Sequence, residues 1–239
     1  EFGAEPGTSV LDGVEHPFRD MRTLRLGDPL QVDGPAVVFA NEWLDAQPFH
    51  RLVLENGIWR EIGVSIAGGK LEEIQFDEIS EGALPYVGNL PTDLPDGYHF
   101  DLPTGASEAL RALAGQSWQG LFLTLDYGKS LAEMLETTPQ GTARAYSNHK
   151  QSNDLLANPG EQDLTCHVCW DWLEKILTDN GFEQVGSLRQ EALFMRHAQT
   201  AIRRVLEDSN NLNGKGRLAE LLHPAHLGLK FQALHGLRR

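Results

Sequence analysis

The feature that most constrains the fold is a short apolar run, AVVFA at residues 36–40, that breaks at once into polar residues. The run contains small, β-branched and aromatic residues without polar interruption, which favours a strand buried on both faces of a parallel sheet. Asn41 and Glu42 follow it directly, and Asp45 comes shortly after. Open α/β sheets bind ligands beyond the carboxyl ends of their strands, so we expect these three side chains at the rim of a ligand cleft.

A second apolar run, GLFLTL at residues 120–125, ends in the same way in Asp126 and Tyr127. Two neighbouring strands that end in acid-bearing clusters predict one shared cleft. A carboxylate such as Glu42 can bind a cation, hold an amine or guanidinium, or act as a base. Asp45 can instead cap a helix, and Tyr127 is either a wall of the cleft or a core aromatic whose hydroxyl is satisfied.

The remaining pattern predicts an α/β protein with a Rossmann-like sheet and an antiparallel hairpin insertion, within a single domain of residues 1–239. Two strands, 49–54 and 58–66, are expected on either side of the turn signal Asn56-Gly57, and a third at 71–76. Further strands are expected at 182–188 and 231–235, and a short one at 22–26. Helical spacing covers 107–114, 169–180, 193–206 and 218–222. Residues 80–105 and 137–165 are predicted to be loops, 49–105 the insertion, and 208–217 a polar linker.

Composition excludes several classes of partner. The net charge of −14 disfavours nucleic acid and anionic membranes, and it suits a cationic ligand or a basic partner segment. We therefore expect a protein partner, no nucleic acid and no membrane, while the sequence sets no oligomeric state. The sequence contains neither a phosphate-binding G-x-x-x-x-G-K-[ST] loop nor a G-x-S-x-G nucleophile elbow.

The two cysteines, Cys166 and Cys169, lie in CHVCW. The pair is either redox-active, half of a zinc site with His167, or two reduced, half-buried thiols at a helix start, and the last interpretation is favoured. We expect no metal site and, from the reduced thiols, a cytoplasmic location.

Three segments carry a resemblance to a known family: VVFANEWLDAQPFHRLV, LFLTLDYGKS and GTARAYSNHKQSNDLLANPGEQDLTCHVCWDWL. They resemble the MidA-like methyltransferases, Rossmann-like enzymes that use S-adenosylmethionine. The resemblance runs from Glu1 to about Gly186, and HPAHLGLKFQALH is similar to the family's closing segment. Mitochondrial members of that family are respiratory complex I assembly factors that methylate an arginine of a partner subunit.

The resemblance implies roles for matched positions. EFGAEPG at the chain start would form a glycine turn under the cofactor, although its glycines can also be explained as a tight turn. The implied cofactor-binding residues are Glu1, Gly3, Ala4, Gly7, Asp28, Asn41 and Asp126. Glu42, Asn41 and Asp45 are the implied catalytic residues, and Tyr127, Arg144, Asp163 and His167 the substrate-side residues of the neighbouring strand end and the long loop. His167 can also merely cap a helix or bond a backbone carbonyl.

Two functions follow from this interpretation. The first is an S-adenosylmethionine-dependent methyltransferase that acts on a protein side chain such as arginine. The second is a catalytically degenerate relative that acts as a binding or assembly factor. The interval between Gly7 and residue 36 is short, so an early strand of the usual sheet is expected to be shortened or lost.

Overall fold

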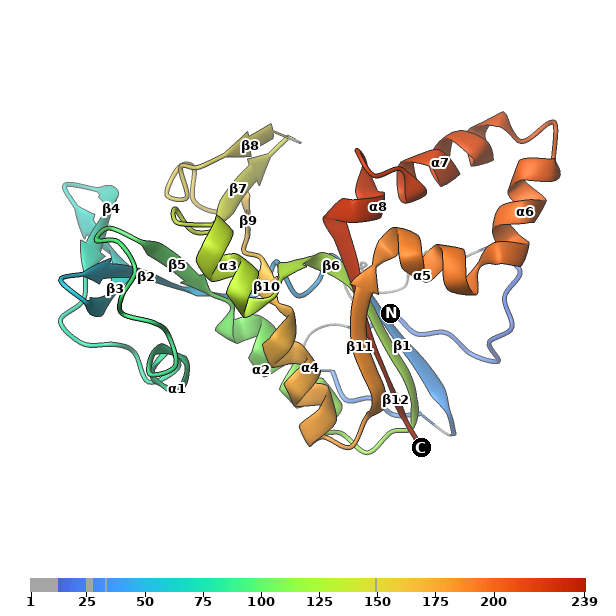
Figure 1. Cartoon of the computed structure of the whole chain (residues 1–239), viewed down its shortest axis with the longest axis horizontal. Coiled ribbons are helices and arrows are strands. Elements are labelled where there is room, and N and C mark those ends of the chain that lie inside the picture. The colour runs from blue at the N-terminus through green and yellow to red at the C-terminus, as the bar shows by residue number, and fades with distance from the viewer. Residues whose placement is uncertain (1–12, 25–27, 33, 149) are drawn as a thin grey trace. The chain divides into compact units, whose positions relative to one another are not determined.

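The computed structural model describes residues 13–24, 28–32, 34–148 and 150–239. The chain forms two compact units (Figure 1). The first unit comprises residues 1–43, 111–128 and 174–239, and the second comprises 44–110 and 129–173. That residues 1–239 function as a single methyltransferase-like domain stays a prediction.

The first unit is built on a sheet with the strand order β1-β6-β12-β11. Its strands are β1 (Ala36–Asn41), β6 (Gly120–Lys129), β11 (Glu183–Arg189) and β12 (Phe231–Arg238). β1 and β6 are parallel, whereas β12 runs antiparallel to both β6 and β11. The predicted Rossmann-like sheet is therefore confirmed, and both apolar runs form neighbouring parallel strands.

Strand β1 is less buried than its composition predicts. Val38 and Ala40 are buried, but Val37 is 43% exposed, so burial on both faces was a wrong expectation. An apolar composition shows only that a strand can be buried. Whether each face of the strand is buried depends on the elements that pack against that face.

The helices of the first unit follow β11. They are α5 (Gln190–His197), α6 (Gln199–Glu207), α7 (Leu212–Leu222) and α8 (Leu227–Lys230). The single helix predicted over 193–206 is divided at Ala198, whose φ of −114° leaves the helical range. The predicted linker 208–217 is also wrong, because Asn211 accepts a hydrogen bond from the Gly214 N–H at 2.8 Å and so caps the start of α7.

Arg238, near the end of β12, ties this strand to the chain that follows helix α2 (Thr104–Ala114). Its Nε donates to the Trp118 carbonyl at 2.7 Å, and Nη1 donates to the Ala114 carbonyl at 2.6 Å. Nη2 donates to the Gln116 carbonyl. The guanidinium also lies over the rings of Trp118 and Phe182, 5.1 and 4.7 Å from their centroids. One planar cation thus satisfies the Ala114 carbonyl at the end of α2 and binds two carbonyls of the segment that follows the helix.

The second unit contains an antiparallel sheet with the order β4-β3-β2-β5, whose four strands are labelled in Figure 1. Its strands are β2 (His50–Glu55), β3 (Ile58–Ala67), β4 (Lys70–Gln75) and β5 (His99–Leu102). Asn56 and Gly57 have φ of 51° and 75°, so they form the left-handed turn that the sequence predicts between β2 and β3. β4 confirms the third predicted strand.

The loop predicted over residues 80–105 is partly wrong, because it contains β5 and the short helix α1 (Leu84–Val87). Pairing with β2 makes HFDL a strand: Phe100 pairs with Leu52 and Leu102 with His50. The inward face of this sheet buries Leu52, Phe100 and Leu102 with Met134 of α3 (Leu131–Thr137). Such pairing between distant segments leaves little local signal in the sequence.

The long segment 137–165 is not mostly irregular, as predicted, but contains a small sheet in the order β8-β7-β9. Its strands are β7 (Arg144–Ser147), β8 (Lys150–Ser152) and β9 (Asp163–Thr165), followed by β10 (Val168–Cys169) and α4 (Trp170–Asp179). The strands are short and polar, so they lack the alternation that identifies a half-buried strand. Gly181, with φ of 79°, ends α4 as the sequence predicts.

The early strand predicted at residues 22–26 falls partly outside the described residues, and Arg22 and Thr23 are not in a strand. Among the helices that the structure describes, none has the length and apolar character needed to cross a bilayer.

Candidate functional site

The polar residues after β1 and β6 lie at one edge of the sheet. The register pairs Asn41 with Leu125, and the Glu42 N–H donates to the Leu125 carbonyl at 3.0 Å. Asp126 is the next residue of β6, so the two polar clusters are neighbours, as the sequence predicts. Both strands are parallel, which brings their carboxyl ends to the edge where α/β sheets bind ligands.

Glu42 holds an unusual backbone conformation at this edge. Its φ is 47°, in the left-handed region that costs a residue with a Cβ roughly 1–2 kcal/mol. Its side chain is exposed, and the Asn41 Nδ2 donates to its Oε1 at 3.3 Å. Strain of this kind persists where the surroundings enforce it, and such sites are often functional.

Asp126 has a different environment from Glu42. It is 0% exposed, its Oδ2 accepts the Trp43 N–H at 3.2 Å, and its Oδ1 accepts the Tyr127 N–H at 2.9 Å. The buried carboxylate therefore anchors the turn that carries Glu42. The cofactor contact that the resemblance implies for Asp126 stays a prediction.

The Tyr127 ring packs on Phe231, with 4.1 Å between ring centroids. Both rings belong to an apolar cluster with Leu125 and Ala233. The packing agrees with the alternative in which Tyr127 is a core aromatic, and its substrate-side role stays a prediction.

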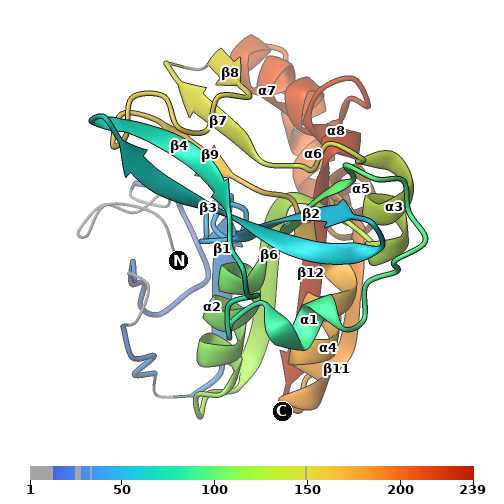
Figure 2. The same ribbon diagram turned by 90° about the vertical axis from the view of Figure 1, so that its left-hand side faces the viewer.

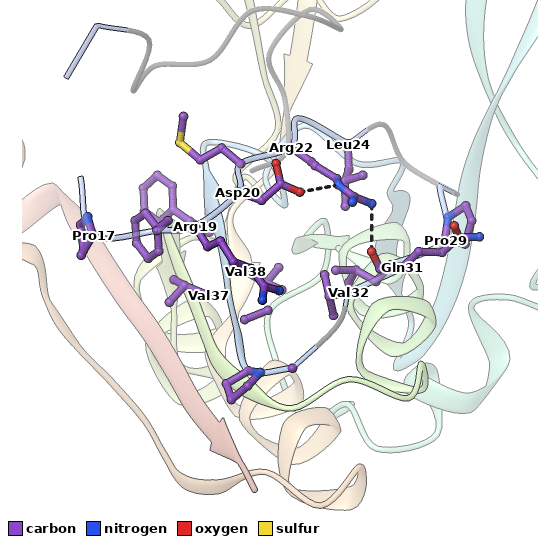
Figure 3. Close-up of a pocket in the computed structure, with 17 residues that line it drawn as sticks. Pro17, Arg19, Asp20, Arg22, Leu24, Pro29, Gln31, Val32, Val37 and Val38 are labelled. Carbon is purple, nitrogen blue, oxygen red and sulfur yellow. Dashed lines mark hydrogen bonds and ion pairs between the residues drawn. The ribbon is translucent and has the colours of Figure 1, made fainter. Parts of the chain in front are cut away.

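A cavity of about 840 Å³ lies in the first unit along β1 (Figure 3). Its described lining comes from residues 17–39, including Val37 and Val38 of β1. At its wall, Arg22 Nε donates to Asp20 Oδ2 at 3.1 Å, and Arg22 Nη1 donates to the Gln31 carbonyl at 2.9 Å. The volume suits a small organic ligand.

The predicted cofactor residues stand apart from this lining. Asn41, Asp126 and the exposed Asp28 are not among the described lining residues, and neither is the predicted catalytic residue Glu42. The predictions for Glu1, Gly3, Ala4 and Gly7 concern positions outside the described residues.

The other predicted site residues belong to the second unit, where Asp45, Arg144, Asp163 and His167 lie along segments that contact one another. The Asp45 carbonyl accepts the Cys166 N–H at 2.9 Å, next to His167. Arg144 of β7 pairs with Thr165 of β9, and Asp163 of β9 pairs with Tyr146 of β7. Asp45 is buried at 5% exposure, whereas Asp163 is exposed. Their catalytic and substrate-side roles stay predictions.

His167 is the predicted residue with the most perturbed titration. Its pKa is lowered to about 4, chiefly by burial and also by the positive charges of Lys129 and Arg144, against the opposing effect of Asp101. The Nδ1 atom is buried and has no hydrogen-bond partner within the described residues. The imidazole is therefore neutral at pH 7.

Both cysteines are free, in agreement with the interpretation as reduced thiols, but they are fully buried and not half-buried as predicted. Burial raises the pKa of the Cys166 thiol well above its usual value, and the charge of Asp101 adds to this. Burial likewise raises the pKa of Cys169 to about 12. Thiols protonated at pH 7 are poor nucleophiles and metal ligands.

Sequence reasoning missed Asp101, the buried carboxylate of β5. At 2% exposure it accepts the Ala143 N–H at 2.7 Å and the Arg51 Nε–H at 3.1 Å, and its Oδ2 also accepts the Thr142 N–H. Arg51 is also paired with Glu73. The available signal was an aspartate inside the apolar segment HFDL, which lay in a predicted loop.

Comparisons with known proteins agree with this fold. Residues 14–188 match the family described as "Putative S-adenosyl-L-methionine-dependent methyltransferase". A crystal structure of an uncharacterized Burkholderia thailandensis protein is 23% identical, with a TM-score of 0.79 over 91% of this chain and 59% of that one. A second crystal structure from the same organism, of a superfamily member bound to S-adenosyl-homocysteine, is 22% identical, with a TM-score of 0.80 over 91% of this chain and 57% of that one. Both likenesses establish the Rossmann-like methyltransferase fold.

Curated relatives are named as protein arginine methyltransferases. The mitochondrial NDUFAF7 homolog of Drosophila melanogaster is 27% identical over 84% of this chain and 47% of its own length. That of Caenorhabditis elegans is 26% identical over 84% and 47%. The mitochondrial NDUFAF7 of Xenopus tropicalis is 32% identical over 60% and 32%. The chain thus spans about half the length, or less, of these curated relatives.

These names overturn the cytoplasmic expectation, because all six curated relatives are designated mitochondrial. The expectation rested on unpaired cysteines, which indicate only a reducing setting and do not distinguish between compartments that share it. The match over residues 14–188, together with the fold, shows that the chain belongs to the MidA-like family of S-adenosylmethionine-dependent methyltransferases.

Proposed function

We propose that this chain carries the methyl-transfer site of an S-adenosylmethionine-dependent methyltransferase whose acceptor is a protein side chain such as arginine. The observation that carries the proposal is the exposed Glu42 at φ 47°, held at the paired ends of β1 and β6. The family match and the names of the curated relatives support it.

The described residues fit a cationic cofactor. An exposed carboxylate and an exposed amide, Glu42 and Asn41, stand together at the sheet edge, and both are acceptors suited to a cation. These two residues would hold the cofactor's methyl-bearing end. When bound, the cofactor supplies an electrophilic methyl group.

Glu42 has a second task in this proposal. A carboxylate can bind a guanidinium through two parallel hydrogen bonds, which orients the nucleophilic nitrogen. The same carboxylate can accept the proton that the nitrogen must lose. Asn41 orients Glu42 through the hydrogen bond to Oε1, and Asp126 fixes the turn beneath both residues.

Two measurements on the full chain test the proposal. Calorimetric titration with S-adenosylmethionine and S-adenosylhomocysteine should show micromolar binding. Transfer of a radioactive methyl group to arginine-containing peptides should then fall by roughly 10²-fold or more in Glu42→Gln, the usual effect of losing a general base. Glu207→Gln, an exposed acid on α6, is the matched control and should leave transfer unchanged.

The two possible failures differ in meaning. An unchanged transfer rate in Glu42→Gln would remove Glu42 from the chemistry. Absence of cofactor binding by the folded chain would refute methyl transfer, and the alternative of a binding or assembly factor would replace it.

A further inference from the structure

The hairpin of β3 and β4 exposes aliphatic side chains on one face. In its register Ile66 pairs with Leu71 and Val64 with Glu73, so these residues share that face. Ile66 is 76% exposed and Val64 is 51% exposed. We call Val64, Ile66 and Leu71 the hairpin patch. Scattered exposed aliphatics are ordinary, but adjacent ones on a sheet face indicate an interaction surface.

The described parts of the chain leave this region open. β4 is the terminal strand of the order β4-β3-β2-β5, and no described strand pairs with its outer edge (Figure 2). Five of its six residues are exposed. An edge strand of this kind offers backbone N–H and C=O groups to a second polypeptide.

The surroundings of the hairpin patch are acidic. Residues 70–81 contain one basic residue, Lys70, and five exposed acids: Glu72, Glu73, Asp77, Glu78 and Glu81. Glu73 is paired with Arg51, and the other four acids form no ion pair within the described residues. The patch therefore combines aliphatic contact area with uncompensated negative charge.

This charge decides between possible occupants. A second copy of the chain also carries a net charge of −14, and a two-fold pairing centred on β4 would place Glu72 opposite Glu73. Like charges directly opposite one another destabilise such a pair. A basic segment with aliphatic residues meets both features of the surface, because it neutralises the acids and covers Ile66 and Val64.

We propose that the hairpin patch and the outer edge of β4 bind a basic, aliphatic segment of a partner polypeptide in an extended conformation. Its backbone adds to the sheet beside β4, its aliphatic side chains cover the patch, and its arginines or lysines meet the acids of residues 72–81. This inference rests on the proposed function and extends it by giving a protein acceptor a docking surface. It is tested without S-adenosylmethionine, so failure of methyl transfer and failure of docking are distinguishable.

The probe is a fluorescein-labelled peptide of alternating arginine and valine, titrated with the full chain while fluorescence anisotropy is followed. A peptide of alternating glutamate and valine serves as the charge control. We expect micromolar binding of the basic peptide, no measurable binding of the acidic one, and an affinity that falls as salt is raised. The double variant Val64→Ser/Ile66→Ser should weaken binding at least tenfold.

Matched variants separate the contribution of the aliphatic patch from that of the acidic charge. Leu212 is 76% exposed on α7, as exposed as Ile66, so Leu212→Ser should leave the affinity unchanged. Glu72→Lys should weaken binding several-fold and reduce the dependence on salt. Circular dichroism checks that each variant is folded, as expected for exposed positions.

Three outcomes would overturn the proposal. They are equal binding of the two peptides, full affinity in the Val64→Ser/Ile66→Ser variant, and sedimentation that shows a wild-type dimer lost in that variant. The last result would assign the surface to a second copy of the chain.

Discussion

Replacement of Asp126 tests whether the candidate site is built on a buried carboxylate. This side chain is 0% exposed and accepts the N–H groups of Trp43 and Tyr127 at 3.2 and 2.9 Å. The Asp126→Asn variant keeps one acceptor oxygen and turns an amide N–H₂ toward the other donor. A hydrogen bond to a charged group contributes about 1.5–3 kcal/mol, and an orphaned buried N–H costs about 1–3 kcal/mol.

From these values we expect Asp126→Asn to lower the free energy of unfolding by about 2 kcal/mol. Asp126→Ala orphans both N–H groups and should lower it by about 4 kcal/mol. Urea unfolding at pH 7, followed by tryptophan fluorescence and circular dichroism, measures both values. Hydrogen exchange at the amides of Trp43 and Tyr127 reports the loss locally, and both amides should exchange faster in the variants.

Asp163→Asn is the control, because Asp163 is exposed and its replacement should change the unfolding free energy by less than about 0.5 kcal/mol. Removing a buried charge can instead leave stability unchanged or raise it, when the cost of desolvating the charge exceeds the gain from its hydrogen bonds. An Asp126→Asn variant as stable as the wild type would therefore refute the anchoring role assigned to this carboxylate.

Three other perturbations test the packing and electrostatics. Arg238→Lys loses the planar fork over Trp118 and should lower the free energy of unfolding by about 1–3 kcal/mol in urea titrations. Gly141→Ala drives a Cβ into Asp101 Oδ2 and should lower the free energy of unfolding by over about 2 kcal/mol. Gly160→Ala, where only a positive φ opposes the change, should lower it less. Thermal melts that rank the two variants equally would contradict this. The pKa of His167 in the folded chain, about 4, lies below its value in the unfolded chain. Between about pH 4 and 6.5 the unfolded chain therefore binds more protons than the folded one, and the free energy of unfolding falls as the pH falls through that window. His167→Gln should flatten this slope in urea titrations at each pH, and an unaltered slope would show that His167 is not the group responsible.

The sequence predicted the parallel pair and its polar ends because both are local signals. AVVFA and GLFLTL are apolar almost throughout, and each gives way abruptly to polar residues. Asn56-Gly57 identified its hairpin for a similar reason, since few residue pairs tolerate two consecutive positive φ angles. The family resemblance added the fold, which the comparisons confirm.

Other elements depended on partners far along the chain. β5 exists because HFDL pairs with β2, and the sheet of β7, β8 and β9 forms from short polar segments without alternation. The break between α5 and α6 and the start of α7 depend on backbone geometry at Ala198 and on the Asn211 cap. Helical periodicity alone does not distinguish one long helix from two short ones.

The candidate site also combines features that the sequence predicts with features that only the tertiary structure determines. Residue order alone placed Asn41 and Glu42 after one strand and Asp126 after the next, because the carboxyl ends of parallel neighbours must meet at one edge of the sheet. Only the tertiary structure assigned different environments to the two acids: Glu42 exposed at φ 47°, and Asp126 buried on two backbone N–H groups. Residue type sets which chemistry a carboxylate can perform, whereas burial and hydrogen-bond partners decide whether that carboxylate is free to meet a ligand.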